Sequence, residues 1–155
     1  MELMEILSRE SVIAGLGVNS KKQLLQSMSE LASGVTGVSA RDIFATLKER
    51  ERLGATGVGR GIAIPHGKLA DLERLYGFFA SLETPVAFDD AVDEKPVDLV
   101  FLLLGPGSAG ADYLKALARI SRMLVDGELT RKLRACEESA ALFALLTEPA
   151  ASHAA

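Results

Sequence analysis

The segment from Val97 to Leu104, VDLVFLLL, limits the possible folds more than any other part of the chain. Its apolar residues fill both alternating sets of positions, so a β-strand formed here is apolar on both faces. Such a strand has to be covered on two sides, as the central strand of a layered α/β protein is. The sequence Gly105-Pro106-Gly107 directly after it ends the strand.

Helical patterns lie on either side of this strand in the sequence. Asn19 or Ser20 is a suitable N-cap for a first helix, which Gly34 is expected to end. Ser39 is a suitable cap for a second helix, which runs to about Leu53. Three more helices are expected nearer the C-terminus, at 109–125, 128–135 and 137–147.

Two further strands are expected before the central one, IAI at 62–64 and YGFFASL at 76–82. Pro65 is expected to end the first of them, because proline lacks the N–H that pairs two strands. These patterns predict an α/β fold: a single domain over residues 1–148, with a mixed sheet of about four or five strands and helices on both faces. Residues 149–155 are expected to form a disordered tail.

Charge and composition exclude several classes of partner. The chain has 17 basic and 21 acidic residues, a net charge of −4, and neither sign is collected into a block. Neither nucleic acid nor an anionic membrane surface is therefore an expected partner. The longest apolar run is too short to span a bilayer and the N-terminus lacks a secretory leader, so we expect a cytoplasmic protein without membrane insertion. The single cysteine, Cys136, allows no intrachain disulfide and is expected to be a small, buried or half-buried helical residue.

The candidate for chemistry is His66, in the stretch RGIAIPHGK. The other histidine, His153, lies among alanines in the tail, where no role is expected. Pro65 and Gly67 on either side leave the ring of His66 displayed at the rim of the sheet, where α/β proteins commonly hold their sites. With a pKa near about 6.5, a histidine at neutral pH is mostly uncharged, and is then both a base and a nucleophile. The alternative is a packed or surface histidine without chemistry.

Other kinds of site that use a histidine need further residues or motifs that this sequence does not contain. The stretch GPGSAG at 105–110 has a proline where the first glycine of a nucleophile elbow belongs. One histidine with scattered carboxylates offers too few ligands for a metal ion. The glycines at 54, 57, 59 and 61 match neither a phosphate-binding P-loop nor a dinucleotide fingerprint. No metal, nucleotide or other cofactor is therefore expected.

The glycine loop and the two arginines before it each allow two interpretations. The glycines either form a tight turn that requires positive φ angles, or leave backbone N–H groups free to meet an anion. Arg50 and Arg52 are either solvated cations in the last turn of a helix, or suited to clamp a phosphoryl group through paired hydrogen bonds. A displayed neutral histidine with anion donors around it suits one reaction, the acceptance of a phosphoryl group on nitrogen.

A resemblance to a known family supports that chemistry. The stretch from Glu49 to Leu69, ERERLGATGVGRGIAIPHGKL, resembles the active-site segment of the enzyme IIA components of the bacterial phosphoenolpyruvate-dependent phosphotransferase system. It resembles the mannitol/fructose/nitrogen type, and the nitrogen-regulatory members most closely. The stretches LETPVAFDDAVDEKPVDLVFLLLGP and YLKALARISRML are also similar to that family, so the resemblance covers nearly the whole chain.

The resemblance implies roles for individual residues. It implies that His66 is phosphorylated, by the phosphohistidine of a small HPr-like carrier, and that Arg50 contacts the phosphoryl group. Gly59 and Gly67 fall in the same phosphate-binding segment. Thr56 can add a hydroxyl donor to it, or stabilise the turn instead.

One position departs from the family pattern. Many members carry a second histidine at the start of the long helix, where this sequence has Tyr113, with Lys115 two residues further on. A supporting role for a second histidine cannot be transferred, and either Tyr113 or Lys115 is a candidate to replace it.

Three functions remain open from the sequence. In the first, the protein is a regulator whose phosphorylation state controls partner proteins, as in the nitrogen-type members that it resembles. In the second, it is a sugar-transport enzyme IIA that passes phosphate to a permease-linked IIB domain. The third is a binding module of the same fold that transfers no phosphate. The absence of a permease or fused carrier segment from the sequence favours the regulator.

Overall fold

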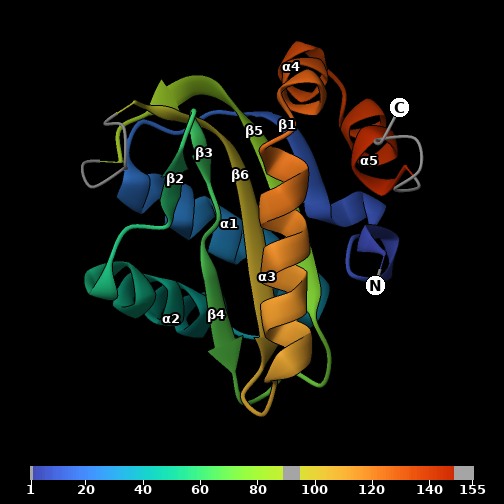
Figure 1. Cartoon of the computed structure of the whole chain (residues 1–155). Helices are drawn as coiled ribbons and strands as arrows, with labels where there is room; N and C mark the ends of the chain where they lie inside the picture. The colour runs from blue at the N-terminus through green and yellow to red at the C-terminus, as the bar shows by residue number, and fades with distance from the viewer. Residues whose placement is uncertain (1, 89–94, 149–155) are drawn as a thin grey trace.

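The computed structural model describes residues 2–88 and 95–148. The predicted tail at 149–155, and His153 with it, lies outside the described residues. The described residues form three layers, with a mixed six-stranded sheet between two layers of helices (Figure 1). The strands are β1 (Val12–Leu16), β2 (Gly57–Gly59), β3 (Ile62–Ala63), β4 (His66–Leu69), β5 (Tyr76–Val86) and β6 (Val97–Pro106). The predicted α/β class and mixed sheet are confirmed.

The strand β6 is central, as its sequence predicted. It pairs antiparallel with β5 on one side and parallel with β3 and β4 on the other, and the full order is β1-β5-β6-β3-β2. Its side chains alternate between two separate cores, one containing Val100 and Leu102, the other Phe101 and Leu103. Each of these four side chains is fully buried, so a polar substitution on either face would lack a partner.

Helices cover both faces of the sheet, as predicted (Figure 1). One face is covered by α1 (Lys21–Thr36) and α2 (Ala40–Leu53). The other is covered by α3 (Ala111–Leu124), α4 (Gly127–Ala135), α5 (Ser139–Thr147) and the short 3₁₀ helices η1 (Leu3–Glu5) and η2 (Arg9–Ser11). No helix among the described residues combines the length and the apolar character needed to cross a bilayer.

The strand IAI does end before Pro65, since β3 ends at Ala63, but the chain pairs with β6 again directly after the proline. The two short strands on either side of it, β3 and β4, lie in line along β6, with Ala63 opposite Val100 and His66 opposite Leu103, so the register is unchanged. Proline removes one donor, but its carbonyl oxygen still accepts from the Leu103 N–H at 3.0 Å. His66 therefore lies inside the paired region, as the first residue of β4.

Several predicted boundaries also differ from the structure. Ser20 and Ser39 do cap α1 and α2, but Gly34 lies within α1, which ends at Gly37 in the left-handed conformation. A helix tolerates one interior glycine at a cost of about 1 kcal/mol. The predicted starts at 109 and 137 lie two residues before those of α3 and α5. Cys136 is half-buried but is the C-cap of α4 in an extended conformation, not a helical residue.

Candidate functional site

Three elements bring side chains together at the edge of the sheet. His66 comes from β4, Arg50 from the last turn of α2, and Tyr113 from the first turn of α3. Arg50 contacts the His66 ring directly, and the centroids of the His66 and Tyr113 rings are 6.2 Å apart. The structure thus brings together three of the residues singled out from the sequence.

Two neighbours determine which ring nitrogen of His66 carries its proton. The Nδ1 atom lies 2.7 Å from the carbonyl oxygen of Ile64, which can only accept, so Nδ1 carries a hydrogen. The Nε2 atom lies 3.2 Å from Nε of Arg50, which can only donate, so Nε2 keeps its lone pair. The contacts therefore select the neutral tautomer whose nucleophilic atom is Nε2.

The surroundings of the ring also favour its neutral form. Burial of the half-buried ring is the main cause that lowers the pKa of His66 below its usual value, and the charge of Arg50 acts in the same direction. The hydrogen bond to the Ile64 carbonyl and the charge of Glu51 oppose this shift without reversing it. At neutral pH the Nε2 lone pair is thus available for bond formation.

Arg50 is held in place from two sides. Its Nη1 donates to the carbonyl oxygen of Gly54 at 2.8 Å, just beyond the end of α2, while its Nε donates to His66. Arg52, the other arginine considered from the sequence, is an exposed cation paired with Glu49 at 3.3 Å. Of the two interpretations for these arginines, the solvated cation fits Arg52, and the contact to the histidine singles out Arg50.

Thr56 stabilises the loop rather than presenting a free hydroxyl. Its side chain is buried and its hydroxyl donates to the carboxylate of Glu51, which also accepts from the Thr56 backbone N–H at 3.2 Å. Lys21 of α1 pairs with the same carboxylate at 2.8 Å. This arrangement supports the turn-stabilising interpretation of Thr56, since the donor is already used.

The glycine loop contains the positive φ angles that one interpretation required. Gly54, Gly59 and Gly61 all have φ between 78° and 152°, and Arg60 between them has φ 58°. Gly59 is buried in β2 and lies opposite Ile62 of β3, so this part of the predicted loop is a paired hairpin. The loop's glycines thus have a conformational reason to be there.

Gly67 makes room for the helix that carries Arg50. A Cβ atom on Gly67 would lie 2.7 Å from Cγ2 of Thr46 in α2, closer than nonbonded carbons approach. The side chain of Thr46 is branched at Cβ and so cannot move aside freely. The glycine lets α2 pack against β4 and keeps Arg50 beside His66.

This contact gives a stability prediction. Gly67→Ala is expected to lower the free energy of unfolding by about 1–3 kcal/mol, because α2 has to shift or the strand has to bend. Thr46→Ser removes the methyl group in question, so the double variant is expected to regain most of the loss. Urea unfolding of the wild type, both single variants and the double variant measures this. A double variant whose loss equals the sum of the two single losses would contradict the close contact.

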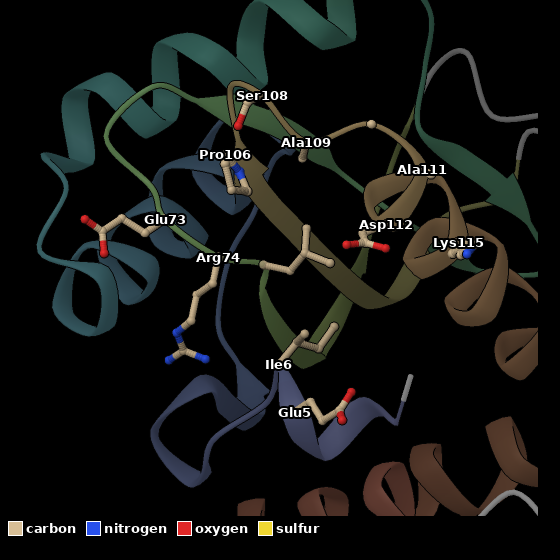
Figure 2. Close-up of a pocket in the computed structure, with 12 residues that line it drawn as sticks. Glu5, Ile6, Glu73, Arg74, Pro106, Ser108, Ala109, Ala111, Asp112 and Lys115 are labelled. Carbon is tan, nitrogen blue, oxygen red and sulfur yellow. The ribbon is translucent and has the colours of Figure 1, made fainter.

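Tyr113 is the buried neighbour of the site, and Lys115 is not. Burial raises the pKa of Tyr113 to about 12, with the nearby charge of Arg50 acting in the opposite direction. Lys115 lines a separate cavity of about 730 Å³ (Figure 2). The other lining residues come from η1, the start of α3 and the segment before β5. Neither His66 nor Arg50 lines that cavity. Of the two candidates for the second-histidine position, the structure places Tyr113 beside His66.

Similarity to known proteins identifies the family of this chain. The family model described as "Phosphoenolpyruvate-dependent sugar phosphotransferase system, EIIA 2" matches residues 5–148. The chain belongs to this EIIA 2 family. A nitrogen regulatory protein of Bradyrhizobium diazoefficiens is 48% identical over 154 residues, which is 99% of this chain and 100% of the relative.

Solved structures extend the same similarity. The nitrogen regulatory protein IIA-Ntr of Neisseria meningitidis has a TM-score of 0.88 and 34% identity, covering 94% of this chain and 99% of that one. A complex of enzyme IIAMTL with phosphorylated enzyme IIBMTL from Escherichia coli matches at a TM-score of 0.76 and 18% identity, with 92% of this chain and 98% of that one covered. The latter likeness shows the fold alone. The nitrogen-regulatory type inferred from the sequence is confirmed by the relatives' identity.

One residue of this EIIA 2 site was missed in the sequence. The Nζ atom of Lys68 lies 5.1 Å from the centroid of the Tyr113 ring, so a cation lies next to the residue that departs from the expected family pattern. The signal was present in the stretch PHGK, because Lys68 is two residues after His66 and alternate residues of a strand share a face. It was missed because Pro65 was expected to end the strand.

The site of this EIIA 2 member can bind an anion and form a bond to it, but no metal centre is evident. Residues 2–88 and 95–148 contain no group of three or more His, Cys, Asp or Glu side chains placed to hold a metal ion. The site offers a nucleophile, the neutral imidazole nitrogen of His66, and two cationic groups. These are the guanidinium of Arg50, which donates to that nitrogen, and the ammonium of Lys68 near the Tyr113 ring. Such a set can attack phosphorus and balance the charge of the phosphoryl oxygens.

Proposed function

We propose that the protein accepts a phosphoryl group on Nε2 of His66 from the phosphohistidine of an HPr-like carrier, and that its phosphorylation state controls partner proteins. The main support for the proposal is the pair of contacts that selects the tautomer of the His66 ring. Ile64 holds the proton on Nδ1 and Arg50 faces the lone pair on Nε2. The family is a phosphotransferase family, and a relative at 48% identity is a nitrogen regulatory protein.

The transfer step follows from these contacts. The Nε2 lone pair attacks phosphorus, a P–N bond forms to His66, and the P–N bond in the donor breaks with its electron pair leaving on the donor's imidazole. The His66 ring becomes cationic because Nδ1 keeps its hydrogen, and the Ile64 carbonyl 2.7 Å away stabilises that charge. Arg50 releases Nε2 and turns its donors to the phosphoryl oxygens, where charge accumulates.

The surroundings of His66 suit a protein donor. The cavity of about 730 Å³ is not lined by His66, so the acceptor nitrogen does not lie in that cavity. Three large apolar side chains close in the sequence to the site residues are exposed: Leu53 in α2, Val58 in β2 and Leu114 in α3. Exposed apolar side chains of this kind are commonly covered when a protein partner binds. A phosphohistidine carried by another protein in the cytoplasm is therefore the donor that we propose.

Two alternatives keep specific support. A sugar-transport role, with a IIB domain as the next acceptor, is supported by the family model, whose description names the sugar phosphotransferase system. A binding module without transfer is favoured only by the tyrosine at the second-histidine position. A pull-down comparing phosphorylated and unphosphorylated protein tests the regulatory proposal. Partners that bind one form and not the other are expected, whereas capture of a IIB domain alone would favour transport.

The neutral form of His66 gives a pH prediction. We expect the NMR titration midpoint of His66 to lie below about 6.5, because burial and Arg50 disfavour the charged ring. Only the neutral His66 ring can accept the phosphoryl group. Protonation of the ring should therefore slow phosphorylation only as the pH falls through that lowered pKa, and not between about pH 6.5 and 8. A midpoint at or above that of an exposed histidine would contradict the account of the site.

A further inference from the structure

Lys68 is the cation closest in the chain to His66 on the same side of the strand. In β4, successive side chains alternate between faces, so His66 and Lys68 point the same way while Gly67 between them faces α2. Lys68 is exposed, and its flexible stem lets the ammonium move. It is therefore placed to approach a group attached to the ring of His66.

Tyr113 is the shared neighbour of both residues. Its ring lies 6.2 Å from the His66 ring and 5.1 Å from Nζ of Lys68, measured to the Tyr113 centroid. The ring itself is fixed, since Tyr113 is buried and a Cβ on Gly105 would lie 2.9 Å from its Cδ1 atom. Gly105 is also the residue opposite Lys68 in the β4–β6 pairing. The Tyr113 ring thus has a fixed position, and the Lys68 ammonium makes a cation–π contact with it close to the His66 ring.

A phosphoryl group on His66 would change the balance of charge near the Tyr113 ring. It brings about two negative charges on three acceptor oxygens. The cationic ring and Arg50 offset the charge, but Nη1 of Arg50 already donates to Gly54, so the oxygens can accept from a further donor. Glu51 adds a further negative charge, already shared by Lys21 and Thr56. Tyr113 cannot supply a positive charge. A charge-assisted hydrogen bond to a phosphoryl oxygen is stronger than an exposed contact of an ammonium with an aromatic ring.

We propose that Lys68 is the second phosphate-positioning residue: when His66 is phosphorylated, its ammonium leaves the face of Tyr113 and donates to the phosphoryl oxygens opposite Arg50. This inference rests on the proposed function, since it needs a phosphoryl group on His66. The movement also changes the surface that a partner meets, because the Tyr113 ring loses the cation that covered it. The protein thereby signals its phosphorylation state through Lys68 as well as through the phosphate.

The test compares three variants in phosphorylation by phosphoenolpyruvate, the first enzyme of the system and its carrier. Lys68→Met is expected to accept phosphate about tenfold or more slowly, because it loses a charge-assisted hydrogen bond made in the transition state. Lys68→Arg keeps a cationic donor and should retain most of the rate. Lys115→Met is the matched control, since Lys115 lines the separate cavity, and it should accept phosphate at the wild-type rate.

An NMR readout separates this role from a merely structural or docking one. The ε-methylene protons of Lys68, shifted by the Tyr113 ring in the unphosphorylated protein, should move toward free-lysine values when His66 is phosphorylated. Lys68→Met accepting at the wild-type rate, or ε protons that do not move in the phosphorylated wild type, would overturn the inference. A wild type that takes up no phosphate on His66 would instead overturn the proposed function.

Discussion

Replacement of His66 by alanine is expected to abolish phosphoryl acceptance. The variant keeps Arg50 and Lys68 but has no nitrogen to form the P–N bond, so the loss should be complete rather than partial. The fold should survive, because the ring is half-buried and lies at the start of the short strand β4. This is the largest effect that the account predicts.

The measurement is mass spectrometry of the intact protein after incubation with phosphoenolpyruvate, the first enzyme and the carrier. The wild type should gain one phosphoryl group, labile to acid and stable to alkali, as a phosphoramidate is. His153→Ala is the matched control, as it removes the other histidine of the chain and should still be phosphorylated. A phosphoryl group that persists in His66→Ala would place the acceptor elsewhere.

The second large effect is expected at Arg50. Its guanidinium offers several donors in a fixed plane, and Arg50→Lys keeps the charge while losing that geometry and the Nε contact to His66. Hydrogen bonds to charged groups contribute about 1.5–3 kcal/mol. Losing one made in the transition state corresponds to a rate roughly 10- to 150-fold slower.

The control for Arg50 is its neighbour. Arg52→Lys makes the same chemical change two residues away, at an exposed arginine paired with Glu49, and should leave the rate unchanged. Initial rates of phosphorylation by the phosphorylated carrier, under single-turnover conditions, measure both variants. Equal rates for Arg50→Lys and Arg52→Lys would return Arg50 to the solvated-cation interpretation.

The parts of the fold that the sequence predicted are those with strong local signals. The segment Val97–Leu104 could only be a central strand because both of its faces are apolar, and β6 is that strand. Ser20 and Ser39 marked two helix starts because their hydroxyls accept from N–H groups three residues on. His66 followed from a short, specific pattern, whereas Arg50 was distinguished from Arg52 by the family resemblance; the two residues are in contact.

The parts that were missed depend on contacts between distant segments. The strand β1 contains Gly15 at a positive φ and pairs irregularly with β5, so its local sequence gives a weak strand signal. The strand β4 forms because β6 is long enough to pair with the residues after Pro65 as well as with those before it. The preference of proline for strand ends, read from the local sequence, does not reveal this pairing. The place of Lys68 follows from the packing of Tyr113, on a helix far along the chain.

The protonation of the His66 ring could not be read from the sequence either. It depends on two atoms, the Ile64 carbonyl oxygen and Nε of Arg50, whose positions follow from the short segment between β3 and β4 and from the end of α2. A pattern such as PHG predicts a displayed histidine, but not which nitrogen is free. The central claim about the chemistry therefore comes from the structure.

That claim is tested most directly by NMR of the phosphorylated protein with ¹⁵N-labelled histidine. Phosphorus is expected to couple to Nε2 of His66, while Nδ1 keeps its hydrogen bond to the Ile64 carbonyl. Coupling of phosphorus to Nδ1, or to any nitrogen outside His66, would contradict it.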